Sequence, residues 1–383
     1  MKALYVAPRY HINQVPIIRG WLQNGHQVMF ISQLAASSED HKDLKPIILG
    51  YSRIFNGLFS LVNKIKHRNH PDALFAVSSK RGFPPYFRLR KLIRDFAPDV
   101  AILRERSLYN IIVHLICKRY HIPCILYNQS PYWNQIPKKK GRLWKTVRRL
   151  SPKYRITPVL GSPGRGKYEE PNSRYVPFVM EPAISPDEKT YCKGGTVQLL
   201  CVGRYMECKK QLVQLEVLKR LIPKYPVHLT FAGEVVSGDQ KAYFKQVIDC
   251  VERDNLQNYV TILTNLPHEK VYDEYRKADL FLLPSSEVTS VSQLEAMSCA
   301  LPVICSNLDG KASYIRNGVN GLLVEPGNAD DLEEKIEYFL NHREKIEEMG
   351  RTNYRTVVET YSFGNYYRQI CEIAEQIKKE GAY

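Results

Sequence analysis

Two glutamates separated by seven residues stand in the stretch PSSEVTSVSQLEAMSCALPVICS, residues 284–306. Glu287 lies in a Ser/Thr-rich segment that follows an apolar run, and Glu295 lies about one turn inside the helix that the pattern predicts next. A carboxylate at that depth can accept hydrogen bonds from two ribose hydroxyls, and a carboxylate in the loop can contact a sugar. Solvated surface charges are the ordinary alternative, but both glutamates fall at the turn between a strand and a helix, where α/β folds bind ligands.

The predicted helix start offers a second kind of contact. Ser290 and Gln293 have the spacing of a capping box, and the amides that follow Ser290 face the same turn. Free N–H groups at a helix N-terminus bind anions such as a diphosphate. The donor-binding residues predicted from this stretch are Val288, Thr289, Ser290, Val291, Ser292 and Glu295.

A pair of cations follows an earlier apolar run, VQLLCVG, residues 197–203. Arg204 comes directly after Gly203, and Lys209 lies five residues further on, where a helix begins. A guanidinium fork and a mobile ammonium at the end of one strand can hold the two phosphates of a diphosphate between them. An ordinary solvated helix start is the alternative for the lysine.

Short apolar runs alternate with amphipathic stretches along the whole chain, which predicts parallel sheets covered on both faces. The expected fold class is α/β, with two Rossmann-like doubly wound domains, each with a ligand crevice at the C-terminal ends of its strands. The strands expected in the first half are residues 3–7, 27–32, 99–104 and 123–128, and those in the second half are 197–203, 227–234, 260–264, 280–284 and 302–306.

The expected domain boundary lies in the proline-containing segment 174–195. We expect a basic N-terminal domain over residues 1–180, completed by the C-terminal helix 362–383, and a C-terminal domain over residues 181–361. Residues 1–180 hold 31 Lys and Arg against 9 Asp and Glu, a net charge of +22, whereas residues 181–383 hold 24 against 30, a net charge of −6. This asymmetry indicates that the first half faces an anionic partner.

The basic character peaks in IPKKKGRLWKTVRRLSPKYR, residues 136–155, which holds nine Lys and Arg and no acidic residue. The run predicts a partly amphipathic helix that can lie on an anionic membrane surface. A solvated helix face and a nucleic-acid contact are the alternatives, and no nucleic-acid-binding module accompanies the run. We therefore expect no nucleic-acid partner.

The remaining bulk features predict an ordinary cytoplasmic protein that can be peripheral at the inner membrane face. No run of about 18 apolar residues predicts a transmembrane helix, and the N-terminus leads into a strand rather than a signal peptide. The nine cysteines are odd in number and scattered, which predicts reduced thiols. No metal-binding cysteine and histidine cluster is present in the sequence.

Taken together, these segments resemble the retaining GT-B glycosyltransferases of the GT4 family, the glycosyl transferases group 1. The resemblance covers residues 195–365 and is carried by Glu287 and Glu295, by the segment from Gly203 to Lys209, and by the tail LPVICSNLDGKASYIRNGVNGLLVEPG. In the first half it rests on NGHQV, residues 24–28, and on the alternation of strands and helices.

The resemblance implies a sugar transfer from a nucleoside diphosphate, most commonly UDP, to a carbohydrate or lipid-linked saccharide in polysaccharide or glycoconjugate synthesis. It implies that the two domains face a cleft and that no metal or other cofactor takes part. Glu287, Arg204 and Lys209 would be catalytic, because they contact the sugar and the leaving diphosphate. The implied donor-binding set adds Gly203 and, near the base, Asn265 and Leu266.

The sequence departs from the family pattern at several places, including Ala300 for a common glycine and PRYHINQVP, residues 8–16, for the usual first loop. Val288, Thr289 and Ser290 stand where the family has Gly-Phe-Gly, and the histidine common after a first-domain strand is absent, with Arg104 and Arg106 in that segment instead. His11, in the first loop, completes the candidate acceptor contacts. The alternatives are a sugar-nucleotide epimerase or hydrolase on the same fold, and a non-catalytic protein that binds anionic surfaces.

Overall fold

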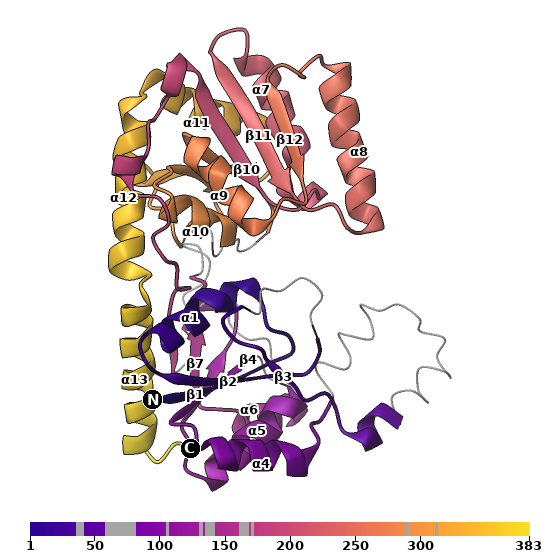
Figure 1. Cartoon of the computed structure of the whole chain (residues 1–383), viewed down its shortest axis with the longest axis vertical. Helices are drawn as coiled ribbons and strands as arrows, with labels where there is room; N and C mark the ends of the chain where they lie inside the picture. Colours follow the sequence, from indigo (N-terminus) through magenta and orange to yellow (C-terminus); the bar gives the residue numbers. More distant parts are fainter. Residues whose placement is uncertain are drawn as a thin grey trace. The chain divides into compact units, whose positions relative to one another are not determined.

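The computed structural model describes residues 1–35, 42–57, 82–104, 107–129, 133–134, 142–160, 168–169, 172–287, 291–308, 310 and 313–383. The chain forms two compact units (Figure 1). Unit 1 comprises Met1–Pro158, Gly166–Val179 and Phe363–Tyr383, and unit 2 comprises Val159–Arg165 and Met180–Ser362. The predicted divisions, after residues 180 and 361, lie one residue from the two main crossings of the chain.

Unit 1 is built on a seven-stranded parallel sheet with the order β3-β2-β1-β4-β5-β7-β9. The apolar runs predicted as strands form its centre, because buried parallel strands are apolar on both faces. A separate antiparallel pair joins β6 (Trp133–Asn134) to β8 (Tyr168–Glu169). The strands of the large sheet are β1 (Lys2–Ala7), β2 (Gln27–Ser32), β3 (Ile47–Ile48), β4 (Val100–Arg104), β5 (Cys124–Tyr127), β7 (Tyr154–Thr157) and β9 (Ser173–Tyr175).

Helices on both faces complete the core of unit 1. Helices α4 (Tyr86–Phe96) and α5 (Leu108–Arg119) pack apolar side chains against one face of the sheet, and α6 (Arg142–Leu150) lies next to α5. Helix α1 (Val15–Gln23) packs with α13 (Phe363–Lys379), which comes from the C-terminal end of the chain. A buried chain of hydrogen bonds joins these elements, since Trp21 Nε1 donates to Tyr5 Oη at 2.8 Å and Tyr5 Oη lies 2.9 Å from Tyr366 Oη.

The basic run 136–155 is not one helix, so this prediction was wrong. Residues 136–141 lie outside the described part of the chain, α6 covers only Arg142–Leu150, and the end of the run belongs to strand β7. Arg155 is 2% exposed, and its Nη2 donates to Asn128 Oδ1 at 3.3 Å. From the sequence alone, a charged residue predicts a position on the protein surface. In the structure the charged side chain is buried, and the neighbouring side-chain amide accepts a hydrogen bond from it.

Unit 2 is built on a six-stranded parallel sheet with the order β12-β11-β10-β13-β14-β15. The predicted strand 260–264 coincides with β12, and the other predicted strands differ from the observed ones by one residue at an end. Strand β15, in the tail segment, was not predicted. The strands are β10 (Val197–Val202), β11 (Val227–Gly233), β12 (Val260–Thr264), β13 (Leu280–Leu283), β14 (Val303–Ser306) and β15 (Gly321–Val324).

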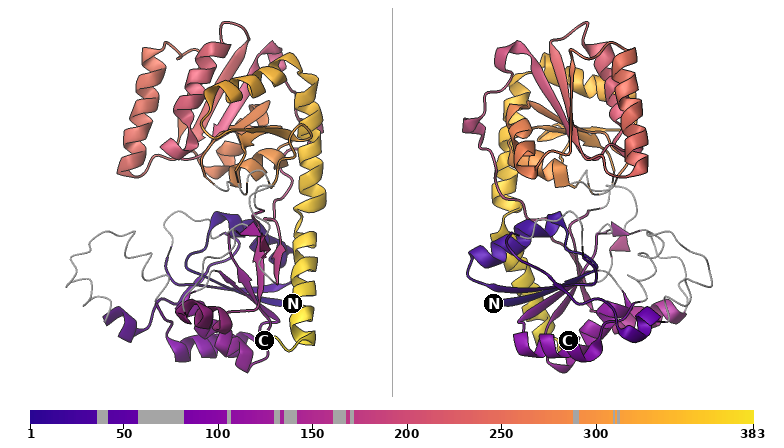
Figure 2. Two further views of the ribbon diagram at one scale, coloured as in Figure 1. Left: turned by 180° about the vertical axis from the view of Figure 1, so that it is seen from behind. Right: turned by 45° about the vertical axis from the view of Figure 1, so that its right-hand side comes forward.

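Helices cover both faces of this sheet as well, and Figure 2 shows the strands between them. Alternate strand residues such as Leu199 and Leu282 pack with α7, α8 and α11, while Phe281 on the other face contacts Tyr275 of α9. Helix α10 packs against α12. The bounds are α7 (Gln211–Leu221), α8 (Gly238–Arg253), α9 (His268–Lys277), α10 (Val291–Ser298), α11 (Ala329–Asn341) and α12 (Glu344–Thr360).

All nine cysteines are free thiols, and five of them are buried in the two cores at 2% exposure or less. Among the residues that the structure describes, no helix combines the length and the apolar character needed to cross a bilayer.

We expect Gly20→Ala to destabilise unit 1, because a Cβ at this position of α1 would overlap the ring of Phe363 on α13. Overpacking of this kind costs about 1–3 kcal/mol, which lowers the Tm measured by calorimetry by several degrees. Gly238→Ala, on α8, is the matched control, because a Cβ there meets open space. Equal Tm values for the two variants would contradict the packing of α13 against α1.

Candidate functional site

Three predicted residues of unit 2, Arg204, Lys209 and Glu287, lie together at the point where the strand order reverses. From β10 the chain proceeds through β11 and β12 to one side of the sheet, then crosses to β13 and proceeds to the other side. Because β10 and β13 are adjacent and parallel, the segments that follow them diverge at the same edge. Such an edge leaves a crevice in which open α/β sheets bind ligands.

A short ion pair connects the two segments at this edge. Lys209 Nζ lies 2.6 Å from Glu287 Oε2, and the lysine is only 4% exposed. Gly203 provides room for the lysine stem, because a Cβ there would lie 3.2 Å from Lys209 Cε. The backbone N–H of Ser286 also donates to the carbonyl of Cys208 at 2.8 Å. The two loops that carry Lys209 and Glu287 are therefore hydrogen-bonded to each other, and their side chains are in direct contact.

Two further side chains surround the Glu287 carboxylate. Arg204 Nη2 lies 3.8 Å from Oε1 and its side chain is 51% exposed, and Cys208 Sγ lies 3.4 Å from the same oxygen. Burial alone would raise the pKa of Glu287, but Lys209, the Cys208 hydrogen bond and Arg204 outweigh it and lower the pKa. The group is therefore an anion at neutral pH, held among two cations and a thiol donor.

Glu295 is held by a second group of side chains. The carboxylate is on α10 and is 8% exposed. Tyr275 Oη donates to Oε2 at 3.0 Å, and His268 Nε2 lies 3.1 Å from Oε1. Burial, followed by the charge of Glu295, raises the pKa of Tyr275, so the phenol stays protonated and donates. Each carboxylate oxygen has two acceptor sites, so Glu295 can accept further hydrogen bonds on the solvent side.

The start of α10 and the loop after β12 complete this edge of unit 2. Helix α10 begins at Val291, and the carbonyl of Ser292 accepts a hydrogen bond from Tyr275 Oη at 3.2 Å. Asn265 Oδ1 accepts from the backbone N–H of Val235 at 2.9 Å, which ties the loop after β12 to the loop after β11. Leu266 is half-buried beside it. Val288, Thr289 and Ser290 lie outside the described residues.

Several contacts were missed in the sequence. Tyr275 contacts Glu295, but in the sequence it is only a core aromatic of α9. Cys208 contacts Glu287, but in the sequence it is an ordinary residue between two predicted cations. His268 also comes from α9. The NLPHEKVYDEY segment shows no pattern from which a contact to Glu295 could be predicted.

The predicted acceptor-side residues lie in unit 1. His11 is in the loop after β1, Arg104 is the last residue of β4, and Arg106 lies outside the described residues. Burial, followed by the charges of Arg104 and Arg9, lowers the pKa of His11 to about 4. His11 and Arg104 are thus close enough to interact, and the imidazole is neutral at physiological pH.

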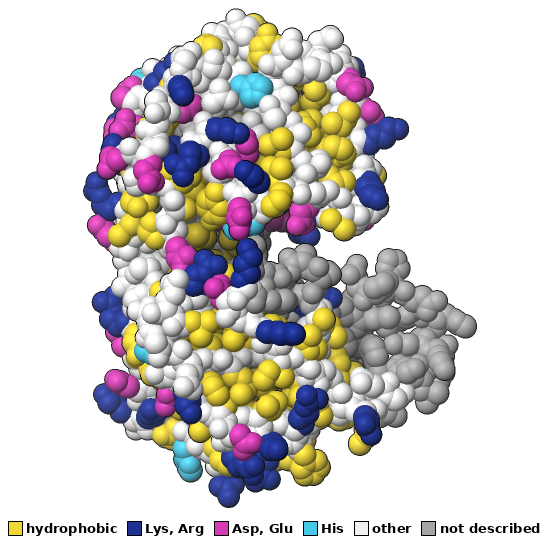
Figure 3. All heavy atoms as spheres, in the orientation of Figure 1, with side chains coloured by type: hydrophobic (Ala, Val, Ile, Leu, Met, Phe, Trp, Pro, Cys, Tyr) yellow, Lys and Arg dark blue, Asp and Glu magenta, His cyan; other side chains and the backbone are white. Residues whose placement is uncertain are grey.

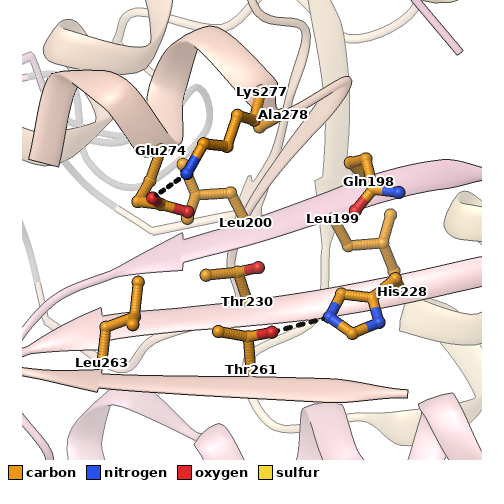
Figure 4. Close-up of a pocket in the computed structure, with 10 residues that line it drawn as sticks. All are labelled: Gln198, Leu199, Leu200, His228, Thr230, Thr261, Leu263, Glu274, Lys277 and Ala278. Atoms are coloured by element: carbon orange, nitrogen blue, oxygen red, sulfur yellow. Dashed lines mark hydrogen bonds and ion pairs between the residues drawn. The ribbon is translucent and has the colours of Figure 1, made fainter. Parts of the chain in front are cut away.

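A separate hollow of about 280 Å3 lies on unit 2 (Figure 4). Its wall consists of β10, β11, β12 and α9, where His228 Nε2 lies 2.9 Å from Thr261 Oγ1 and Lys277 pairs with Glu274. None of the predicted site residues lines it. No group of three or more His, Cys, Asp and Glu within the described ranges is arranged to hold a metal ion.

The chain is similar to proteins of known family over its second half. Residues 187–356 match the family model for glycosyl transferases group 1, which confirms the resemblance predicted from residues 195–365. An uncharacterized glycosyltransferase of Methanocaldococcus jannaschii is 33% identical over 114 residues, 30% of this chain and 32% of that protein. A D-inositol 3-phosphate glycosyltransferase of Pseudarthrobacter chlorophenolicus is 29% identical over 161 residues, 41% of this chain and 37% of that protein.

The chain thus spans about a third of the length of these curated relatives. Solved structures match along its whole length. A glycosyltransferase from Rickettsia africae has a TM-score of 0.70 and 17% identity, with 98% of both chains covered. HepE of Anabaena in complex with UDP has a TM-score of 0.68 and 14% identity, with 98% of this chain and 100% of that chain covered. The predicted fold class, two doubly wound α/β domains of the GT-B type, is confirmed.

We expect Lys209→Met to raise the pKa of Glu287, because the favourable charge disappears while the burial of the carboxylate remains. The lowered pKa in the native protein means that the pair stabilises the fold above the unfolded pKa of about 4.3 and that this stabilisation disappears as the pH falls through the folded pKa. Carboxyl 13C NMR titration, with Glu287→Gln to assign the signal, measures the change. Lys210→Met is the control, and an unchanged Glu287 pKa in Lys209→Met would contradict the geometry.

Proposed function

Because residues 187–356 belong to the glycosyl transferases group 1 family, we propose that the chain is a glycosyltransferase that moves a sugar from a nucleoside diphosphate to a carbohydrate or lipid-linked saccharide. The single observation that carries the proposal is the contact among Arg204, Lys209 and Glu287 at the switch point of the matched domain. Two cations and a carboxylate that are held together at this edge support the binding of a diphosphate-linked sugar.

The donor site that we propose uses the edge of unit 2. Arg204, Lys209 and the first amides of α10 bind the diphosphate, since cations and helix N-termini both favour anions. Glu295 accepts hydrogen bonds from the ribose, and its two fixed partners support this role because they orient the carboxylate before the ligand arrives. The backbone near Asn265 and Leu266 lies beside the base.

The transfer breaks the bond between the anomeric carbon and the diphosphate oxygen, and the acceptor hydroxyl forms the new bond with retention of configuration. The leaving diphosphate gains negative charge, which Arg204 and Lys209 stabilise without a metal ion, and the sugar gains positive charge, which the Glu287 anion faces. Charges fixed in advance in a partly buried site are an effective source of transition-state stabilisation. The acceptor proton leaves with the diphosphate.

The proposed donor is a UDP-sugar, and it serves polysaccharide or glycoconjugate synthesis. Support comes from the fold shared with HepE, whose structure contains UDP. UDP, GDP and ADP should be compared by calorimetry, because a specific nucleotide stabilises the folded protein according to its affinity. A failure of all three nucleotides to bind would contradict the donor site.

We expect Arg204→Ala and Glu295→Ala to affect different kinetic parameters. Arg204 acts on charge that develops in the transition state, so its removal should lower kcat by about 100-fold with a smaller change in KM. Removal of Glu295 should weaken nucleotide binding by about tenfold or more, because the ribose loses a charged acceptor. Steady-state kinetics with the donor, and calorimetry with the free nucleotide, measure the two effects.

A matched control for these variants is Arg276→Ala, a change on α9 at a residue outside the proposed site. Unchanged nucleotide affinity in Glu295→Ala would refute the assignment of the ribose contact. Release of free sugar without an acceptor would instead favour a hydrolase on the same fold.

We also propose that unit 1 contacts an anionic membrane surface around α6. The described part of the basic run supports this, because Arg149 and Leu150 of α6 are exposed. On α5, which lies next to α6, Leu115 is 46% exposed, and on α4, which lies next to α5, Phe87 is 83% exposed. Figure 3 shows Lys and Arg side chains beside hydrophobic ones over α4 and α5. Exposed apolar side chains among cations are typical of surfaces that bind anionic lipids.

We expect binding to vesicles that contain phosphatidylglycerol and weaker binding to pure phosphatidylcholine vesicles, because cations are attracted to the anionic surface. The double change Arg148→Gln and Arg149→Gln should weaken cosedimentation by about tenfold, at about 1 kcal/mol per charge. The matched control is Lys241→Gln with Lys245→Gln on α8. Binding that is equal for both double variants would exclude α6 as the contact.

A further inference from the structure

Helix α9 supplies two side chains that hold Glu295. His268 is the first residue of the helix, and Tyr275 lies seven residues further on, two turns along and on the same face. Both contact the carboxylate, His268 Nε2 at 3.1 Å and Tyr275 Oη at 3.0 Å. Because Glu295 is on another helix, α10, these contacts require that α9 keeps its rotation about its axis.

The core of unit 2 holds α9 through one side chain. All residues of α9 are described, and of these only Tyr275 is buried, with its ring 5.9 Å from that of Phe281 on β13. Tertiary packing normally provides most of the stability of a helix. A helix that buries so little apolar surface therefore needs other contacts to fix its rotation.

The ammonium of Lys189 binds the C-terminal end of α9. Its Nζ donates to the carbonyls of Tyr275 at 2.9 Å, of Arg276 at 3.1 Å and of Ala278 at 2.9 Å. The last carbonyls of a helix have no partner within it, and their partial negative charge favours a cation. An ammonium has three N–H donors, and these carbonyls use all of them. One of the three bonds goes to Tyr275, the residue whose hydroxyl donates to Glu295.

The segment that carries Lys189 is itself fixed to unit 2. The carboxylate of Asp279 accepts hydrogen bonds from the backbone N–H of Cys192 at 2.7 Å and of Gln198 at 2.8 Å. The Lys189 Nζ also lies 5.5 Å from the centre of the Tyr191 ring, a distance at which a cation is attracted to an aromatic face. The lysine therefore reaches α9 from a backbone whose position is determined on both sides of the contact.

We propose that Lys189 is a positioning residue for nucleotide binding: it holds the C-terminal carbonyls of α9 and so fixes the rotation that brings Tyr275 to Glu295. The inference rests on the proposed function for the role of Glu295 as the ribose contact. The dependence of the Glu295 contacts on Lys189 requires only the geometry of unit 2. In the sequence Lys189 lies in the segment 174–195, which indicates only a domain boundary.

The change Lys189→Met removes the three donors and keeps a side chain of similar length. The experiment is done at pH 7, where the ammonium form predominates because burial lowers the pKa of Lys189 to about 8. We expect calorimetry to show about fivefold weaker UDP binding, because Glu295 remains but is less well oriented. A purely structural role would instead lower the number of sites per chain and leave the affinity of the folded fraction unchanged. Lys189→Arg, which keeps the charge and can donate to carbonyls, should restore part of the affinity.

The matched control is Lys277→Met, because Lys277 is in the last turn of the same helix but pairs with Glu274 (Figure 4). If Lys189→Met does not fold, Lys189→Gln takes its place, since its amide still has two donors. In a Glu295→Ala background, Lys189→Met should cause no further loss of UDP affinity, because the carboxylate through which it acts is gone. An equal loss in both backgrounds, or an equal loss in Lys189→Met and Lys277→Met, overturns the proposal.

Carboxyl 13C NMR without nucleotide tests the geometry separately from the donor site. The Glu295 signal, assigned with Glu295→Gln, should move in Lys189→Met and keep its position in Lys277→Met. A Glu295 signal that is unchanged in Lys189→Met overturns the positioning role, whatever the result for UDP. If the signal moves but the wild-type protein binds no nucleotide, Lys189 positions Glu295 as inferred and the proposed donor site is wrong.

Discussion

The ion pair between Lys209 and Glu287 is the interaction on which the candidate donor site depends. A buried charge without a partner of opposite charge destabilises the fold. A lysine that is 4% exposed therefore needs such a partner, and so does a half-buried carboxylate. Their contact joins the segments after β10 and β13, which are adjacent only because the strand order reverses between them. Arg204 and Cys208 then surround a carboxylate whose position is already determined. The site is therefore a consequence of the sheet topology as much as of the residue types.

Most of the fold could be predicted from the sequence because the strands of both sheets are short apolar runs separated by amphipathic helices. Strands β2 and β12 have the predicted bounds, residues 27–32 and 260–264. Strand β7 could not be predicted, because its Tyr154 and Arg155 end a run dominated by cations. Arg155 donates to Asn128, a residue that follows strand β5, and no local pattern contains that information.

For the candidate site, the sequence could predict which residues lie at one edge of the sheet, because that depends on the topology. It could not predict which side chains contact one another there. Spacing identified Glu287 and Glu295, because both follow a strand that ends in the crevice. Their partners could not be identified, because the contact of Glu295 with Tyr275 depends on the rotation of α9 about its axis. In the sequence Tyr275 is one of the apolar positions on one face of a predicted helix. Nothing in the sequence pattern predicts a hydrogen bond from its hydroxyl group.

The two switch points show how one sheet topology brings different side chains together at the same kind of edge. Both sheets place basic residues after their first strand, Arg204 and Lys209 in unit 2, and Arg9 with a neutral His11 in unit 1. In unit 2 a carboxylate lies among the cations, so the edge offers both signs of charge within a few ångströms, which suits a ligand that separates charge as it reacts. At the corresponding edge of unit 1, Arg104 donates to the side-chain amide of Gln129, and His11 is neutral. The sheet topology therefore determines which segments meet at an edge, and the residues that follow each strand determine the charges that the edge carries.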